Sequence, residues 1–178
     1  MKNVFLLLGL AWLGACSADK KTADAAGATV VAFNDFESGG GWLPDPTLGA
    51  KGQAHSGQYA MLVDKDHEFS LTFRSTLGLL SPRKFKKLRL EAWAYMPTEA
   101  ATGNLGIQVM DASNQKQVYG DGISFRTAIQ DYGKWVPISK DFTLPDNITA
   151  NENLRMFLWR ADAQGEVLVD DIKLSILE

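Results

Sequence analysis

Residues 87–96, KLRLEAWAYM, alternate one by one between small or apolar side chains and charged or aromatic ones. Successive side chains of a β-strand point to opposite faces of a sheet, so this alternation predicts a strand with one buried face. An amphipathic helix is excluded here, because it places its apolar residues three or four positions apart. The buried face would carry Leu88, Leu90, Ala92, Ala94 and Met96.

Similar short runs recur from residue 29 onward, and turn sequences such as SGGG, ATGN, DASN and DAQG separate them. We expect strands over 29–33, 58–63, 69–73, 87–96, 104–111, 117–124, 134–142, 153–160 and 167–176. About eight or nine strands at this spacing, with no amphipathic helix between them, predict an all-β fold. The expected architecture is a two-sheet antiparallel β-sandwich of the jelly-roll type.

The composition indicates one globular domain that does not bind nucleic acid. Of the 178 residues, 46% are hydrophobic and the net charge is −3, which favours a globular chain over a disordered one. Lys and Arg form no long stripe, so a nucleic-acid partner is not expected. We expect a monomer.

The N-terminal residues have the organisation of a secretory signal peptide. Lys2 precedes residues 4–13, VFLLLGLAWL, which are apolar and uncharged. This segment is shorter than the roughly 20 residues that a transmembrane helix needs, and it has the size of a signal-peptide core. Gly14 and Ala15 then precede Cys16, the only cysteine of the chain.

The order Leu-Gly-Ala-Cys resembles the lipobox of bacterial lipoproteins. The resemblance implies that residues 1–15 are removed and that Cys16 becomes the lipid-modified first residue. Two or more acyl chains hold a protein stably on a membrane. Ser17, where an Asp would signal retention in the inner membrane, implies export to the outer membrane if the host is Gram-negative. The alternative is a secreted protein with a stray cysteine in its signal peptide.

Residues 16–28 consist of the expected lipidated cysteine followed by small, polar residues without periodicity. This composition predicts a flexible tether that reaches about 20 Å. Residues 29–178 would form the jelly-roll domain, and the lipid would be its only membrane anchor. The domain has no cysteine, so it depends on its own core or on a metal for stability.

The faces opposite the predicted core mix aromatic rings with charged and amide groups. A pyranose has an apolar C–H face that stacks on a ring, and a rim of hydroxyl groups that hydrogen-bonds to such polar groups. The pattern therefore predicts a sugar site on one sheet face. The alternative is a second hydrophobic layer covered by a loop. The predicted ligand-binding residues are Glu91, Trp93, Tyr95, Gln108, Arg155 and Trp159.

Four stretches resemble the β-jelly-roll carbohydrate-binding modules that accompany cellulases and xylanases, within the galactose-binding-like fold. They are FNDFESG (33–39), AHSGQYAMLV (54–63), YGKWVPISKDFTLP (132–145) and VLVDDIKL (167–174). The resemblance implies a module that binds a polysaccharide or an oligosaccharide without cleaving it.

A structural calcium ion is a further expectation. By strict alternation, Asp170 shares an apolar face with Leu168, Ile172 and Leu174. A carboxylate there is costly unless it is paired or bound to a metal. The resemblance adds Glu37 as a second ligand, and oxygen ligands of this type suit calcium. The alternative is a carboxylate that caps backbone N–H groups or pairs with a lysine.

The sequence contains no G-x-S-x-G or H-E-x-x-H motif, and strand 87–96 carries only one acid, Glu91. Glycoside hydrolysis requires a pair of carboxyl groups. We therefore expect a non-catalytic, glycan-binding surface lipoprotein. The alternatives are an envelope scaffold that binds another protein, or a jelly-roll glycosidase or lyase.

Overall fold

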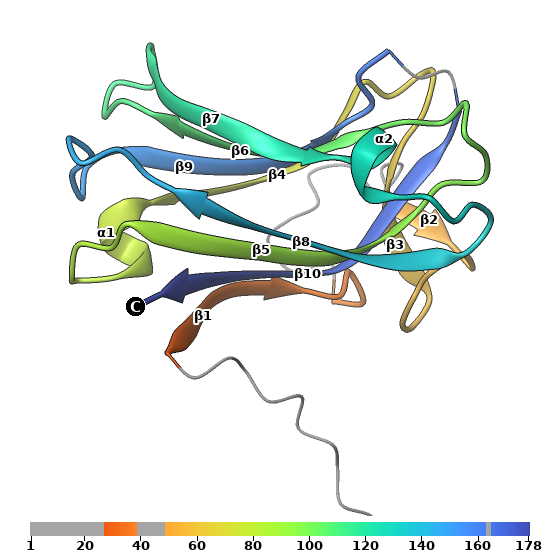
Figure 1. Cartoon of the computed structure of the whole chain (residues 1–178), viewed down its shortest axis with the longest axis horizontal. Helices are drawn as coiled ribbons and strands as arrows, with labels where there is room; N and C mark the ends of the chain where they lie inside the picture. The colour runs from red at the N-terminus through yellow and green to blue at the C-terminus, as the bar shows by residue number, and fades with distance from the viewer. Residues whose placement is uncertain (1–26, 39–48, 163–164) are drawn as a thin grey trace, which may run out of the picture.

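The computed structural model describes residues 27–38, 49–162 and 165–178, and in this part of the chain two antiparallel sheets pack face to face (Figure 1). The predicted all-β sandwich is therefore confirmed. The predicted signal peptide, Cys16 and the tether up to residue 26 lie outside the described residues.

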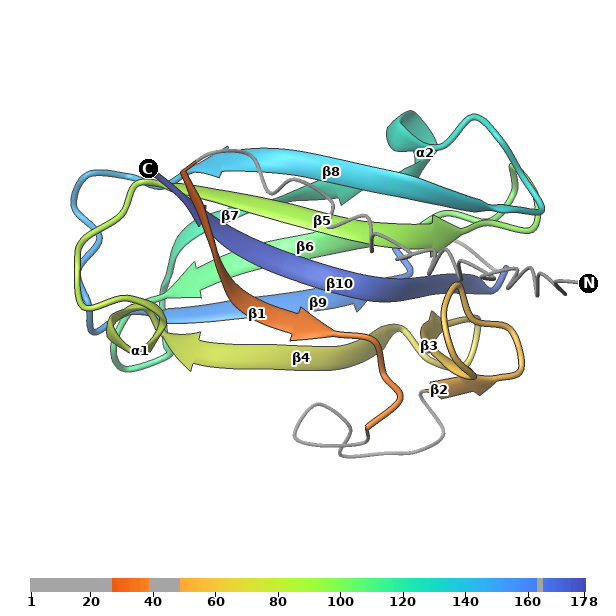
Figure 2. The same cartoon turned by 90° about the horizontal axis from the view of Figure 1, so that it is seen from below.

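Sheet A contains six strands and is organised around the C-terminal one. Its strands are β1 (Ala28–Asn34), β2 (Gly49–Lys51), β3 (Tyr59–Val63), β5 (Lys87–Tyr95), β8 (Trp135–Thr143) and β10 (Val167–Leu177). The order is β2-β3-β10-β5-β8, and β1 also pairs with β10. Strand β10 thus has β5 on one side, while β3 and β1 share its other side (Figure 2).

Sheet B contains four strands in the order β4-β9-β6-β7. They are β4 (Phe69–Thr76), β6 (Asn104–Met110), β7 (Gln117–Ser124) and β9 (Asn153–Trp159). The predicted strand ranges agree with the structure to within a few residues at each end. Strand β2 was not predicted, because three residues are too few to show a period of two.

Two single-turn helices of the structure were also not predicted from the sequence. They are α1 (Leu77–Leu80) and α2 (Phe125–Ala128), and each buries one apolar residue, Leu77 and Phe125. Four residues cannot display the spacing of an amphipathic helix. No helix in the described part of the chain has the length and apolar character needed to cross a membrane.

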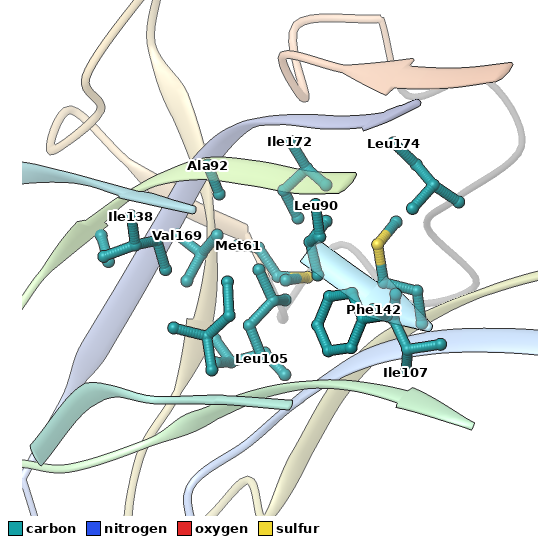
Figure 3. Close-up of a cluster of buried hydrophobic side chains, with 14 of the residues drawn as sticks. Met61, Leu90, Ala92, Leu105, Ile107, Ile138, Phe142, Val169, Ile172 and Leu174 are labelled. Carbon is teal, nitrogen blue, oxygen red and sulfur yellow. The ribbon is translucent and has the colours of Figure 1, made fainter. Parts of the chain in front are cut away.

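The core lies between the sheets and is built from every second residue of the strands (Figure 3). All five apolar residues predicted to face inward from 87–96 are buried. Leu90 of sheet A and Leu105 and Ile107 of sheet B lie in this layer. Burying one such side chain stabilises the fold by about 1.5–3 kcal/mol. The same alternation turns the remaining side chains outward, where they form the two outer faces of the sandwich.

Candidate functional site

An open groove of about 330 Å³ lies on the outer face of sheet B, the face turned away from sheet A. Three neighbouring strands supply its side chains, and the pairing register places Thr72 opposite Phe157 and Arg155 opposite Gln108. Strand pairing, together with the period of two within each strand, therefore brings residues far apart in sequence onto one surface. The groove is lined by Phe69, Thr72, Arg74, Gln108, Arg155 and Phe157.

Glycine at position 106 makes room for one of these rings. Gly106 lies opposite Phe157, and a Cβ atom at this position would be 3.1 Å from the phenyl ring. The next strand also has a glycine in this row, since Gly122 pairs with Gly106. The ring of Phe157 can therefore lie close over the backbone of β6.

Three aromatic rings meet at one end of the groove. The ring of Phe69 stacks on that of Trp159, with centroids 6.2 Å apart and planes 15° apart. It also contacts Phe157 in an edge-on arrangement at 5.9 Å. Phe69 is 50% exposed, so one aromatic side chain of the cluster is presented to solvent. Trp159 donates its indole N–H to Glu68 Oε1 over 3.3 Å, which orients the indole.

The other end of the groove is polar. Arg155 donates from Nη2 to Asn114 Oδ1 over 3.1 Å. Its Nε atom is buried and has no hydrogen-bond partner within the described part of the chain. Gln108 donates its side-chain amide to Gln117 Oε1. This end therefore offers guanidinium and amide groups that suit hydroxyl or carboxylate oxygens.

The structure divides the six predicted ligand residues between two opposite faces. Gln108 and Arg155 line the groove on sheet B, and Trp159 stacks on Phe69 at its end. The other three predicted residues, Glu91, Trp93 and Tyr95, project from the outer face of sheet A. Strands β5 and β9 show the same alternation but belong to different sheets, so the six predicted ligand residues do not share one sheet face.

The three residues on sheet A are engaged with their neighbours. The ring of His55 stacks on Trp93, with centroids 3.8 Å apart and planes 11° apart. His55 also contacts Trp135, which packs against Tyr95. Glu91 pairs with Lys173 over 3.0 Å. A turn that contains His55 thus covers one face of Trp93.

The sequence prediction did not include Phe69, Thr72, Arg74 or Phe157 as ligand residues. Phe157 was detectable, because it alternates with Arg155 and Trp159. Thr72 and Arg74 also alternate along one face of β4. Phe69 was not detectable by alternation, because a register shift between Phe69 and Thr72 turns it outward.

The premise of the calcium prediction needs one correction. Asp170 lies opposite Trp93 on the outer face of sheet A, whereas Leu174 lies opposite Leu90 in the core. A bulge between Asp170 and Lys173 breaks the alternation, and Asp171 within it has a φ of 49°. Asp170 therefore does not share a face with Ile172 and Leu174, although it is fully buried.

Both predicted calcium ligands face one turn of the backbone. Asp170 Oδ2 accepts hydrogen bonds from the backbone N–H groups of His55 and Ser56, at 2.9 and 3.0 Å. Glu37 Oε1 accepts from the backbone N–H groups of Gln58 and Tyr59, at 2.6 and 2.7 Å. Burial raises the pKa of the Asp170 carboxyl above its ordinary value, although these backbone donors oppose the rise.

These bonds match the capping alternative, and they also leave acceptor capacity, because a carboxylate oxygen has more than one lone pair. In the described part of the chain, no three acidic, histidine or cysteine side chains are grouped to hold a metal. Carboxylates and backbone carbonyls are the ligands that calcium takes. Glu37 and Asp170 offer oxygen ligands of the type that calcium takes, and a calcium site formed by them would need turn carbonyls to complete the coordination.

Comparison with known proteins finds solved structures with a similar fold but no match by sequence. No protein-family model matches the chain, and no curated protein matches its sequence. The CBM22-1 xylan-binding domain from Paenibacillus barcinonensis Xyn10C matches the structure with a TM-score of 0.58 and 15% identity, over 87% of this chain and 99% of that one. The chain has the fold of a carbohydrate-binding module.

Two further modules with this fold come from Clostridium thermocellum Xyn10B. The C-terminal family 22 module matches with a TM-score of 0.54 and 16% identity, over 86% of this chain and 96% of that one. The CBM22-1-GH10 modules, complexed with xylohexaose, match with a TM-score of 0.56 and 18% identity, over 85% of this chain and 29% of that one. The carbohydrate-binding-module fold predicted from the sequence is confirmed.

Proposed function

We propose that this chain is a non-catalytic glycan-binding protein whose site is the groove on sheet B. One observation carries the proposal: the half-exposed ring of Phe69 shares one groove with Phe157 and with the polar groups of Gln108 and Arg155. Binding sites for small molecules combine aromatic surface with a few polar groups that fix orientation. A sugar uses both, since its C–H face stacks on a ring and its hydroxyl groups hydrogen-bond.

The structural neighbours support this proposal by their own ligands. The Paenibacillus module is a xylan-binding domain, and the Clostridium CBM22-1-GH10 modules were solved together in complex with xylohexaose. The cleft of the other Clostridium module acts in ligand binding. Carbohydrate binding is therefore a role of domains that share this fold at low sequence identity.

A panel of polysaccharides tests the proposed function directly. The purified full chain is run through native gels that contain xylan, β-glucan, galactan or pectin, and each polymer is assayed for new reducing or unsaturated ends. We expect retardation by at least one polymer and no product from any. Product formation would overturn the non-catalytic assignment. Failure to bind any glycan would overturn the function and favour a protein-binding scaffold.

We also propose that the protein is exported as a monomer and anchored by lipid on Cys16, in the outer membrane if the host is Gram-negative. Residues 16–28 are the proposed tether, and β1 of the described fold begins at Ala28, where this tether would end. Mass spectrometry of the mature N-terminus tests this proposal. Cys16→Ser should release the protein from the membrane fraction, and an unmodified Cys16 would contradict the anchor.

Finally, we propose that Glu37 and Asp170 hold a structural calcium ion beside the turn of residues 55–59. Their convergence on that turn and the burial of Asp170 support this proposal. A bound cation would stabilise the ionised form of the buried carboxylate, and the ion would brace the turn that covers Trp93.

A further inference from the structure

We propose that the groove on sheet B selects acidic glycans, and that Arg74 and Arg155 together bind the carboxylate of a uronic acid residue. This inference rests on the proposed glycan-binding function and names its ligand class.

The two arginines are direct partners across neighbouring strands. The register of β4 and β9 places Arg74 opposite Arg155, on the outer face of sheet B. Side chains in such positions start only about 5 Å apart, and like charges directly opposite each other destabilise a sheet. An anion bound between the two guanidinium groups would remove this repulsion.

Sheet A contains the opposite arrangement. Arg89 of β5 lies opposite Asp141 of β8, and it donates two hydrogen bonds to that carboxylate, at 2.6 and 2.8 Å. On sheet A, the protein itself supplies the carboxylate that neutralises the cross-strand arginine. On sheet B, the cross-strand partner of an arginine is a second arginine, so two cations face each other.

No carboxylate within residues 27–38, 49–162 and 165–178 forms an ion pair with Arg74 or Arg155. Among the described residues, the Arg155 side chain donates to the neutral amide of Asn114, and its buried Nε donor has no acceptor there. Buried donors are normally satisfied, and an unpaired one costs free energy. A carboxylate is a strong acceptor for guanidinium groups, because two parallel, charge-assisted hydrogen bonds form.

The rest of the groove fits a sugar that carries such a carboxylate. Phe157 lies two residues along β9 from Arg155, which is about 7 Å and comparable to one sugar ring. A sugar ring stacked on Phe157 can therefore direct its carboxylate to the arginine pair. The acidic residue Glu68 is at the far end, where it accepts the indole N–H of Trp159.

The charge of the whole chain makes this selectivity testable. The net charge is −3, so the protein as a whole repels polyanions at neutral pH. Preference for an acidic polymer must then come from a local cationic site.

The experiment uses the full chain with polygalacturonate, alginate and glucuronoxylan, each compared with its carboxyl-reduced, neutral form. At least one acidic polymer should bind about tenfold more tightly than its reduced form, because charge-assisted hydrogen bonds are lost on reduction. Arg74→Gln and Arg155→Gln should each abolish most of that preference, and Arg74→Lys should retain part of it. Arg83→Gln is the matched control, since Arg83 is exposed and outside the groove.

The outcomes separate this inference from the proposed function. Equal binding of acidic and reduced polymers, with loss of binding in Phe69→Ala, would overturn acidic selectivity and leave glycan binding intact. Equal weakening by Arg83→Gln and Arg74→Gln would indicate nonspecific attraction and would also overturn the inference. Absence of binding to every polymer would overturn both. Circular dichroism of each variant establishes that it is folded before its affinity is compared.

Discussion

Phe69 of β4 lies directly opposite Trp159 of β9, and the two rings stack with their planes 15° apart. This pairing depends on a bulge between Phe69 and Thr72, which turns Phe69 to the outer face of sheet B. One ring of the cluster is then available to solvent beside a groove that contains guanidinium and amide groups. The proposed glycan site depends on this local departure from strict alternation.

Removing the exposed ring of the groove should weaken glycan binding. Phe69→Ala is expected to reduce affinity about three- to tenfold, because an aromatic contact contributes about 0.5–1.5 kcal/mol beyond the area it buries. Affinity electrophoresis and isothermal calorimetry measure the change. Phe33→Ala is the matched control, because Phe33 is 56% exposed on the outer face of sheet A. Similar losses in both variants would exclude a site centred on Phe69.

Trp93 should act on stability rather than on glycan affinity. Its ring is covered by His55, and it projects from the sheet opposite the groove. Trp93→Ala is expected to lower the free energy of unfolding by about 2 kcal/mol, which is below the loss for a fully buried Trp. Urea unfolding gives this value, and a glycan titration of the folded variant should match the unmodified protein. Lost affinity with unchanged stability would move the site to sheet A.

The Arg89–Asp141 pair should give a measurable acid dependence. The hydrogen bond from Arg89 lowers the pKa of the Asp141 carboxyl below its ordinary value of 3.8. A lowered pKa in the folded state stabilises the fold above the unfolded-state pKa, and this contribution is lost as pH falls through the folded-state pKa. Asp141→Asn should therefore be less stable than the unmodified protein at neutral pH, and the difference should shrink below about pH 4.

Unfolding free energies of both proteins, measured from neutral pH to about pH 2, provide this comparison. A difference that stays constant over the whole range would contradict the assigned role of the pair.

Calcium should raise the melting temperature if Glu37 and Asp170 bind it. A ligand that binds only the folded state stabilises it by RT ln(1 + [L]/Kd), so chelation should lower the melting temperature. Glu37→Gln is an informative variant, because its amide oxygen can still accept from Gln58 and Tyr59 while losing the charge. Scanning calorimetry with calcium and with chelator should show a shift only in the unmodified protein. The absence of any shift would leave backbone capping as the role of both carboxylates.

Much of the fold follows from local alternation. The inward residues of 87–96 are all buried, and the other predicted strands also form. Two bulges mark where this reasoning fails. The bulge at Phe69 adds a ring to the outer face of sheet B, and the bulge at Asp170 separates this carboxylate from the core residues Ile172 and Leu174. A bulge inserts one residue into a strand, and alternation carries no signal of it.

The sequence by itself determined the strands other than β2, their inward faces away from the bulges, and the chemistry of the outward side chains, because these depend on the period of two within each strand. Only the tertiary structure decided that Trp93 and Trp159 belong to opposite faces and that Arg74 lies opposite Arg155. The physical reason is that strand pairing is set by hydrogen bonds and packing between segments far apart in the chain, and a single strand contains no information about its neighbours.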